Sequence, residues 1–481
     1  MSKKLTTGRL AVLLIGHSLT DKEKIAEIIR KKGSKIYFVG IGGVGVFALA
    51  QLSLDMGLSV FGSDRRDSDR ISALIRAGAC VTISHRREQI YRIMPDLLVY
   101  SLAIDKDNAE YRAASELNIP AVSRAEYLGA VMKNYASPIG VCGSHGKSTT
   151  VAILGKIFEE ASKSPTVIAG AALECGSSYL AGERENLIYE ACEYGDSFLQ
   201  LSPKIQVMLN LDLDHTDYFS SLERIKESFT AAANLASLCA VMNADDENLR
   251  SIAENIAVPV VTFSEGFGYS YRIEKRGCAS GRYSFALYRG DEPEPLCEVS
   301  LSVAGEFNVH NAAAAIIAAD ICGIDKNIIA KAVSEFRGIE RRLEYIGNSE
   351  KCAIYYDYAH HPREIEATKK ALFGMGYNNI CAIFAPHTYT RTKFFFSELA
   401  SSLHGFGEVY ITDIYGAREA PIVGVSSNSL AEAVRELGTE AYAVGADYDV
   451  SNIEMNKFDC LVLMGAGDLE KIKEKIKPEG V

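Results

Sequence analysis

The sequence predicts an α/β protein of three domains, each with a largely parallel sheet flanked by helices. Apolar runs of strand length alternate with stretches of helix length along nearly the whole chain, and this alternation is typical of parallel sheets with right-handed crossovers. The length of 481 residues is also more than one hydrophobic core normally supports. We expect the domains at residues 1–134, 135–340 and 341–481, with 1–34 as an N-terminal extension.

The first domain is expected to alternate strand and helix. A buried strand at 36–39 runs into a glycine-rich turn and then into a helix that ends near Met56. Further strands are expected at 58–61 and 97–101, and further helices at 68–77 and 108–117. In the extension we expect a strand and a helix, the helix in the charged stretch 21–32.

The second and third domains show the same alternation, with one exception. A polar break at 133–138 precedes the second domain, and the exception is 271–302, where apolar and polar residues alternate as in antiparallel strands. The third domain begins after 338–342. Strands are expected at 139–142, 187–191, 205–210, 353–356, 380–385, 409–411 and 461–464, and alanine-rich helices around 231 and 312.

Composition excludes several classes of protein. The net charge of −11 argues against non-specific binding to nucleic acid or to an anionic membrane. The apolar run 10–15 is too short for a secretory signal, and no stretch approaches the ~20 apolar residues of a membrane helix. Eleven cysteines without a C-x-x-C pair indicate reduced thiols. We therefore expect a cytoplasmic protein with no nucleic-acid partner and no membrane insertion.

Residues 143–148 have the pattern of a phosphate-binding loop. The sequence G-S-H-G-K-S follows a predicted strand and precedes an amphipathic helix, although Val141 stands where the full consensus has its first glycine. The backbone N–H groups at the helix start would bind phosphate, Lys147 would reach the β- and γ-phosphates, and Ser148 would bind Mg²⁺. The ATP-binding residues expected here are Gly143, Ser144, His145, Gly146, Lys147, Ser148 and Thr149.

Acidic and imidazole groups follow two later strands of the same domain. Glu190-Ala-Cys-Glu193 ends one strand, and Asp212-Leu-Asp-His215-Thr-Asp217 follows another. Carboxylates at strand ends beside a phosphate loop suit Mg²⁺, a hard cation that prefers oxygen ligands. The sequence therefore predicts a magnesium site in the second domain.

The glycine-rich turn of the first domain has two interpretations. Gly40-x-Gly42-x-x-Gly45 follows a strand, and Asp64 ends the next one, which fits the fingerprint of dinucleotide-binding domains. On that basis the protein would be an NAD-dependent oxidoreductase. Alternatively, the same helix-start amides would bind the diphosphate of another nucleotide.

Motifs in all three domains resemble those of the Mur ligases of bacterial peptidoglycan assembly. The phosphate loop resembles the family's G-T-x-G-K-[ST], and the acidic motifs resemble its E-A-x-E and D-H-x-D. The stretch 305–314 resembles G-x-H-N-x-x-N-A, residues 341–342 an R-R pair, 357–362 D-Y-G-H-H-P and 386–391 P-H-R-Y-T-R. The resemblance covers about residues 35–470, with the motifs in the family's order.

The resemblance implies a Rossmann-like first domain, a central domain like those of P-loop ATPases and a Rossmann-like third domain. It also assigns roles to residues of this chain. The implied catalytic residues are Lys147, Glu190 and His215, and the implied metal ligands are Ser148, Glu190 and His215. Further ATP-binding residues are Asn308, Asn311, Arg342 and Asp357. The UDP-sugar would be bound by Gly40, Gly42, Gly43, Gly45, Ser63, Asp64 and Ser101, and the amino acid by Tyr358, His360, His387 and Arg391.

The chain departs from the family pattern at several positions. In the ATP and amino-acid motifs, Cys192 replaces an aspartate, Phe307 a histidine and Thr388 an arginine. On the sugar-nucleotide side, the departures are Val46, Leu102 and Cys175 with their neighbours. These last three bear on the donor substrate more than on the ATP chemistry.

The resemblance implies an ATP-dependent ligase that joins an amino acid, L-alanine in the leading hypothesis, to the carboxylate of UDP-N-acetylmuramate through an acyl phosphate. ATP and Mg²⁺ would be its cofactors. One alternative is a related ligase that takes a peptide or another amino acid. A second is a nucleotide-binding regulator without ligase turnover, and the third is the oxidoreductase. The oligomeric state and the role of residues 1–34 are left open.

Overall fold

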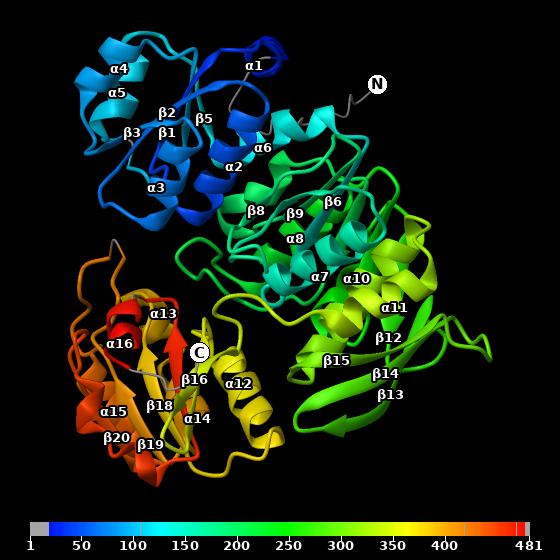
Figure 1. Ribbon diagram of the computed structural model, residues 1–481, viewed down its shortest axis with the longest axis vertical. Coiled ribbons are helices and arrows are strands. Elements are labelled where there is room, and N and C mark those ends of the chain that lie inside the picture. Colours follow the sequence, from blue (N-terminus) through cyan, green and yellow to red (C-terminus); the bar gives the residue numbers. More distant parts are fainter. Residues whose placement is uncertain (1–18, 106, 418, 468, 477–481) are drawn as a thin grey trace, which may run out of the picture.

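The computed structural model describes residues 19–105, 107–417, 419–467 and 469–476. Three sheets, each flanked by helices, form three domains (Figure 1). The five-stranded sheet belongs to the N-terminal domain, the ten-stranded sheet to the middle domain and the six-stranded sheet to the C-terminal domain. The predicted fold class is confirmed. The exact domain boundaries stay a prediction.

The N-terminal domain has a wholly parallel sheet in the order β3-β2-β1-β4-β5. The chain reverses its direction of travel across the sheet between β1 and β4, so the turn after β1 lies at a switch point of the sheet order. The strands are β1 (Lys35–Val39), β2 (Ser59–Asp64), β3 (Cys80–Ile83), β4 (Leu97–Tyr100) and β5 (Ala121–Ser123). The helices are α1 (Leu19–Arg30), α2 (Val44–Asp55), α3 (Asp69–Arg76), α4 (Arg87–Ile93), α5 (Ala109–Glu116) and α6 (Arg124–Val131).

The middle domain joins a parallel centre to an antiparallel edge. Its sheet order is β15-β14-β13-β12-β11-β10-β6-β9-β7-β8. The strands from β13 to β7 in this order run parallel to one another, whereas β14, β15 and β8 are each antiparallel to their neighbours. The strands are β6 (Ser137–Cys142), β7 (Thr166–Ile168), β8 (Tyr179–Leu180), β9 (Asn186–Glu190), β10 (Ile205–Met208), β11 (Cys239–Asn243), β12 (Val260–Ser264), β13 (Tyr271–Ala279), β14 (Arg282–Arg289) and β15 (Cys297–Ala304). The helices are α7 (Lys147–Glu160), α8 (Leu222–Ala233), α9 (Glu247–Ile252), α10 (Phe307–Ile321) and α11 (Lys326–Glu335).

The C-terminal domain has the sheet order β16-β17-β21-β18-β19-β20, parallel except for the edge strand β16. Its strands are β16 (Glu344–Ser349), β17 (Cys352–Asp357), β18 (Ile380–Ala385), β19 (Glu408–Ile411), β20 (Glu440–Ala443) and β21 (Cys460–Gly465). Its helices are α12 (Pro362–Gly374), α13 (Tyr389–Phe394), α14 (Phe396–Leu403), α15 (Ser427–Glu436) and α16 (Glu470–Lys475).

The strand expected in the extension lies outside the described residues. Every other expected strand and helix is confirmed, most of them with shifted ends. The run 10–15 lies outside the described residues. Eight strands were missed: β3, β5, β7, β8, β11, β12, β16 and β20. Most are short and near a sheet edge, where one face meets solvent and the apolar signal is weak.

The domains are joined in two different ways. One hydrophobic cluster runs from α1 through α6 into β6, β9 and β10, so the N-terminal and middle domains share a core. A Cβ on Gly129 of α6 would lie 2.2 Å from the Gln200 carbonyl oxygen, which shows how closely that helix packs on the middle domain. The two clusters of the C-terminal domain contain only residues between 343 and 476. Among the described residues, no helix is long and apolar enough to cross a membrane.

Candidate active site

The phosphate loop, residues 143–148, connects β6 to α7. Gly143 and Gly146 have φ values of +147° and +84°, which L side chains rarely adopt. A Cβ on Gly146 would lie 2.3 Å from Asn311 Oδ1, so only glycine lets α10 approach the loop this closely. Within the part of the chain that the structure describes, no side chain caps the start of α7, so its first backbone N–H groups remain available to bind an anion.

The side chain of Lys147 lies along the phosphate loop. Its Nζ donates to the carboxylate of Glu193 at 3.0 Å and to the Ser144 carbonyl oxygen at 3.2 Å. Burial alone would lower the pKa of Lys147, but the negative charge of Glu193, with smaller effects from Cys192 and Glu190, raises that pKa well above its ordinary value. The ammonium group is therefore kept charged beside the phosphate loop.

The strand ends beside the loop supply the predicted metal ligands. Ser148 Oγ donates to Glu190 Oε2 at 2.7 Å, and His215 Nε2 lies 3.4 Å from Glu193 Oε1. Because β9 and β10 flank β6 in parallel, their carboxyl ends lie at the same sheet edge as the loop. The structure thus brings Ser148, Glu190 and His215 to this edge and adds Glu193, which the sequence motif contained but which we had not included in the site.

His145 occupies the centre of a polar network. Its backbone N–H donates to Asn210 Oδ1 at 2.8 Å, and its carbonyl oxygen accepts from Asn210 Nδ2 at 3.0 Å. Its ring lies between two carboxylates, 3.0 Å from Glu364 and 3.4 Å from Asp212. Burial lowers the pKa of His145, but these two carboxylates outweigh it and raise the pKa to about 9. Asp212 belongs to the acidic motif recognised in the sequence, where it had no role of its own, and Glu364 was not predicted.

A cavity of 1240 Å³ extends from the phosphate loop to the C-terminal domain. Two predicted asparagines form its wall on α10, where Asn311 Nδ2 donates to Asn308 Oδ1 at 3.1 Å. A nucleotide fits such a space, since ligand pockets commonly measure about 300–1,000 Å³. The predicted ATP-binding residues that line it are His145, Gly146, Thr149, Asn308, Asn311, Arg342 and Asp357.

The hinge between the middle and C-terminal domains forms one side of this cavity. Arg341 and Leu343 have φ values of +56° and +49°, so the chain turns sharply on both sides of Arg342. Asp357 at the end of β17 accepts the N–H groups of Leu343 and Ala359 at 2.9 and 2.8 Å. Burial raises the pKa of Asp357 to about 6, although the nearby charge of Arg342 lowers it. Asp357 therefore fixes the hinge as well as facing the cavity.

The four residues predicted to bind the amino acid gather at the middle–C-terminal boundary. The rings of Tyr358 and His360 lie 5.2 Å apart, and those of His360 and His387 lie 5.7 Å apart. Arg391 donates from NH1 to His387 at 2.9 Å and from NH2 to Asp214 at 2.7 Å. Burial is the main reason that the pKa of His360 falls to about 4 and that of His387 to about 3, so both imidazoles are neutral at pH 7.

The glycine-rich turn of the N-terminal domain is held by Asp64, which the sequence placed at the end of the next strand. Gly42 donates its backbone N–H to Asp64 Oδ2 at 2.9 Å. A Cβ on Gly45 would lie 2.7 Å from the Arg124 guanidinium, which places a cation beside the turn. Gly40 has a φ of +75°, and Gly43 ends the turn at the first residue before α2.

Ser63 and Ser101 take local roles in the structure. Ser63 is fully buried and donates to Glu110 Oε2, at 2.5 Å, while its Oγ lies 2.8 Å from His85 Nδ1. Ser101 accepts the Ala103 N–H at 3.1 Å. The Ser63 hydroxyl therefore holds β2 to α5 within the domain, and its assignment to the sugar nucleotide stays a prediction that these contacts do not favour.

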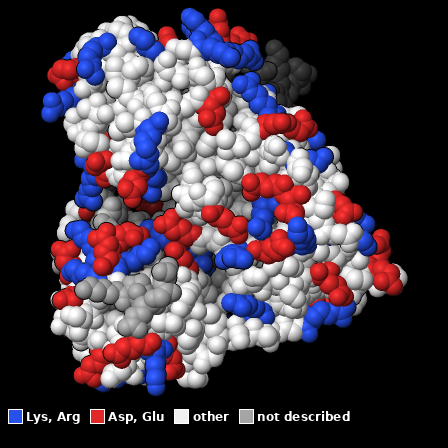
Figure 2. All heavy atoms as spheres, viewed as in Figure 1, with Lys and Arg blue, Asp and Glu red and all other residues white. Residues whose placement is uncertain are grey.

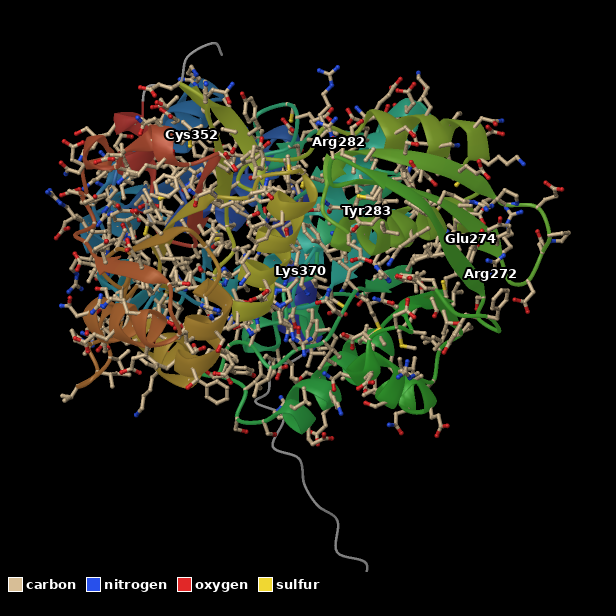
Figure 3. All side chains as sticks on the ribbon, turned by 90° about the horizontal axis from the view of Figure 1, so that it is seen from below. Arg272, Glu274, Arg282, Tyr283, Cys352 and Lys370 are labelled. Carbon is tan, nitrogen blue, oxygen red and sulfur yellow. The ribbon has the colours of Figure 1, made fainter. Side chains whose placement is uncertain are left out.

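A second cavity of 850 Å³ adjoins the first, between the β13–β14 turn and the α12–α14 pair. Tyr283 lines it from the middle domain and Lys370 from α12 (Figure 3). Phe307 borders both cavities. At the end of the turn, a Cβ on Gly281 would lie 2.7 Å from the Met375 side chain, so the hairpin contacts the end of α12 directly.

Three family models together match most of the chain. The Mur ligase family catalytic domain matches residues 35–136, the Mur ligase middle domain 141–319, and the Mur ligase glutamate ligase domain 341–467. The UDP-N-acetylmuramate–L-alanine ligase of Caldicellulosiruptor bescii is 36% identical over 454 residues, which cover 93% of this chain and 99% of the relative. The chain belongs to the Mur ligase family.

Other Mur ligases support the same membership. The UDP-N-acetylmuramate–L-alanine ligase of Caldanaerobacter subterraneus is 37% identical, over 94% of this chain and 99% of that relative. Among solved structures, the UDP-N-acetylmuramate–alanine ligase of Thermotoga maritima superposes with a TM-score of 0.78 at 27% identity, covering 92% and 98% of the two chains. A murein peptide ligase from Psychrobacter arcticus shares the fold, with a TM-score of 0.70 at 21% identity. Membership decides against the oxidoreductase interpretation.

On the sugar-nucleotide side, the three residues that depart from the Mur ligase pattern lie in different surroundings. Val46 is buried within α2. Leu102 is half exposed, and its Cδ1 would contact a Cβ on Gly195 of the middle domain. Cys175 begins a turn whose next residues reach the N-terminal domain, where Ser177 Oγ donates to Gln51 at 3.2 Å. Leu102 and the Cys175 turn thus lie at the boundary between two domains.

The sequence did not reveal the roles of four polar residues that contact the predicted site residues. These are Asn210, Asp212, Asp214 and Glu364. Glu364 carried a local signal, because it lies three residues after His361 at the start of α12, in the position of a capping box. The other three lie within or beside the 212–217 motif, but only His215 was given a role. Their partners come from other segments, and single-sequence spacing does not reveal them.

Proposed function

We propose that this Mur ligase joins L-alanine to the carboxylate of UDP-N-acetylmuramate at the expense of ATP, as in the leading hypothesis from its sequence. The observation that carries the proposal is the full-length similarity to ligases of that name, at 36–37% identity, in a chain whose phosphate loop is fully formed. Around that loop, a charged lysine, strand-end carboxylates and two cavity-lining asparagines occupy the positions expected for ATP.

In the first step, an oxygen of the muramyl carboxylate attacks the γ-phosphorus of ATP, the bond to the β,γ-bridging oxygen breaks, and ADP leaves. The product is an acyl phosphate. Negative charge accumulates on the transferred group, so we assign its stabilisation to the Lys147 ammonium and to the N–H groups at the start of α7. Glu193 keeps that ammonium charged and directs it along the loop.

Ser148, Glu190 and His215 are proposed to hold Mg²⁺. Their chemistry fits, because a hydroxyl and a carboxylate lie 2.7 Å apart beside the phosphate loop and offer hard oxygen ligands. The imidazole of His215 approaches from the next strand end, near Glu193. When bound, the ion would neutralise charge on the phosphates. Glu190 is held in place by the Gly170 N–H, which donates to Oε2 at 2.5 Å.

In the second step, the amine of the amino acid attacks the acyl carbon, and phosphate leaves with the oxygen that came from the carboxylate. The amine gives up a proton as the amide forms, and the proton leaves with the phosphate. We assign the amino-acid end to Tyr358, His360, His387 and Arg391, where the two imidazoles are neutral and able to accept a hydrogen bond. Because Arg391 is already paired with Asp214, an amino-acid carboxylate at this end would compete with Asp214 for the guanidinium.

The sugar nucleotide is proposed to bind the N-terminal turn through Gly40, Gly42, Gly43 and Gly45, with Asp64 and Arg124 beside it.

Figure 2 shows acidic and basic side chains interspersed on one face of the molecule, rather than separated into fields of one sign. Since ATP and UDP-sugars are cytoplasmic metabolites, we propose that the enzyme acts in the cytoplasm.

The test is phosphate release from Mg-ATP with UDP-N-acetylmuramate as donor and a panel of acceptors. The panel contains L-alanine, glycine, L-serine, D-alanine and a tripeptide. We expect turnover with the highest kcat/KM for L-alanine and a product whose mass equals the donor plus alanine minus water. Highest kcat/KM for the tripeptide would replace the proposal with peptide ligation. Tight ATP binding without turnover on any member would replace it with a regulatory role.

A further inference from the structure

Among the described residues, the middle and C-terminal domains share no hydrophobic cluster. The hydrophobic clusters of the C-terminal domain stop at residue 343, and those of the middle domain end at Ile339. Across this boundary the described residues form ion pairs, among them His145–Glu364 and Asp214–Arg391. When two domains separate, both partners of such a pair return to water together, whereas a shared core would expose apolar surface, so we expect the C-terminal domain to be the part that opens and closes.

The two carboxylate oxygens of Glu364 contact different domains. Oε2 accepts the backbone N–H groups of His360 and His361 at 3.0 and 3.2 Å and so caps its own helix, α12. Oε1 points across the boundary to His145 Nδ1 at 3.0 Å, with Arg342 NH1 at 3.9 Å. Helix capping needs only one oxygen. The second is therefore free to act on the other domain.

His145 transmits this contact to the phosphate loop. Asn210 of the middle domain holds both the N–H and the carbonyl of His145, whereas the ring is held by Glu364 of the C-terminal domain. The next residue, Gly146, lies against Asn311 and has no room for a Cβ. Lys147 follows directly. His145 thus links Glu364 of the C-terminal domain to the loop segment that lies between Asn210, the asparagine wall of the cavity and Lys147.

We infer that Glu364 is a positioning residue for phosphoryl transfer: on closing, the C-terminal domain sets Glu364 Oε1 against His145 and thereby fixes the phosphate loop. The inference rests on the proposed function. Glu364 need not touch the substrate, since it acts through His145. The phosphate loop then takes its final geometry only as the C-terminal domain closes. ATP is therefore aligned for attack only when that domain has closed over it.

The first test is a pair of single variants and their combination. Glu364→Gln keeps a carbonyl oxygen that can cap α12 but removes the charge that holds His145. His145→Gln removes the ring while leaving the main chain to Asn210. We expect each to lower kcat about tenfold or more, with the KM for ATP changed less than about threefold, because alignment rather than nucleotide binding is lost. The double variant should be no slower than the slower single one.

The matched control is Glu366→Gln. Glu366 lies on the same helix and pairs with Lys369 at 2.8 Å, but it does not contact the phosphate loop. Its kcat should equal that of the wild type. Thermal unfolding of all variants separates misfolding from misalignment. Wild-type kcat in Glu364→Gln would overturn the inference, as would a double variant whose loss equals the product of the two single losses, since independent residues multiply.

Small-angle scattering gives a readout that does not need ligase activity. With a non-hydrolysable ATP analogue and Mg²⁺, the radius of gyration of the wild type should fall, and Glu364→Gln should show a smaller fall at full nucleotide occupancy. An equal fall in both proteins would contradict coupling through Glu364. If the wild type closes on the analogue yet turns over no acceptor, the proposed function fails while the coupling is still measured.

Discussion

Arg391 of the C-terminal domain and Asp214 of the middle domain form a buried ion pair, with NH2 2.7 Å and Nε 3.1 Å from the same carboxylate oxygen. Both side chains are less than a tenth exposed. The same oxygen accepts the backbone N–H of His215 at 2.6 Å, and His215 has the left-handed φ of +52°. The pair therefore joins two domains and also holds the turn that presents His215.

Breaking this pair from one side should be costly. Arg391→Met leaves the buried Asp214 carboxylate without its partner, and we expect a loss of about 3–5 kcal/mol in the free energy of unfolding. Arg391→Met combined with Asp214→Leu should recover part of that loss, because no buried charge remains. Denaturant unfolding followed by tyrosine fluorescence measures both.

The control is Arg87→Met. Arg87 pairs with Glu116 at the surface, where both side chains are half exposed, and its loss should leave stability unchanged. If Arg391→Met were as stable as this control, the buried pair would not hold the domains together.

Lys147→Ala should abolish most of the activity. The ammonium is the charged side chain held along the phosphate loop, so its removal is expected to lower kcat on the order of 10³-fold. Phosphate release with all substrates saturating is the measurement. Lys156→Ala, on the same helix but paired with Glu174, should keep wild-type kcat. Full activity in the Lys147 variant would contradict the assignment of the loop.

Stability should fall with rising pH because of His145. The folded protein raises the pKa of this imidazole from 6.5 to about 9, so its stabilising contribution is complete below pH 6.5 and is lost as the pH rises through 9. Asp212 and Glu364 supply the negative charge, while His361 and Arg363 face the same network.

The measurement is the free energy of unfolding of the wild type and of His145→Gln between about pH 6 and pH 10. The difference between them should shrink toward high pH by on the order of 1–3 kcal/mol. A difference that stays constant across this range would show that His145 is not charged in the folded protein.

Glu190→Gln should weaken the response to Mg²⁺. A neutral amide is a poorer ligand for a hard dication than a carboxylate, so we expect half-maximal activity to require about tenfold more Mg²⁺ or more. Activity is titrated with the metal at fixed ATP. Glu185→Gln, just before the start of β9, is the control and should titrate like the wild type. Equal Mg²⁺ requirements in the two variants would remove Glu190 from the metal site.

The fold was largely predictable from the sequence because buried parallel strands are continuous apolar runs between amphipathic helices. The strands at 139–142, 380–385 and 461–464 are wholly buried and were predicted almost to their ends. Strands such as β8 and β20 lie at sheet edges, are short and are partly exposed, so neither their length nor their pattern identified them.

The site was predictable where the chemistry lies within one segment. The phosphate loop is contiguous, so its glycines and Lys147 could be recognised together. Glu364 and Asp214 act through partners 219 and 177 positions away, and no pattern within a segment shows such a pairing. Arg391 illustrates the same limit: the motif predicts a cation for the amino acid, whereas only the folded chain shows Asp214 already bonded to it.

The most direct test of the account uses UDP-N-acetylmuramate whose carboxylate oxygens are both ¹⁸O. Attack of that carboxylate on the γ-phosphorus, followed by displacement of phosphate by L-alanine, transfers one labelled oxygen to the phosphate. Mass spectrometry of the released phosphate should therefore show one ¹⁸O per molecule, and the amide product should retain the other. Unlabelled phosphate formed together with the amide would contradict an acyl phosphate and, with it, the proposed mechanism.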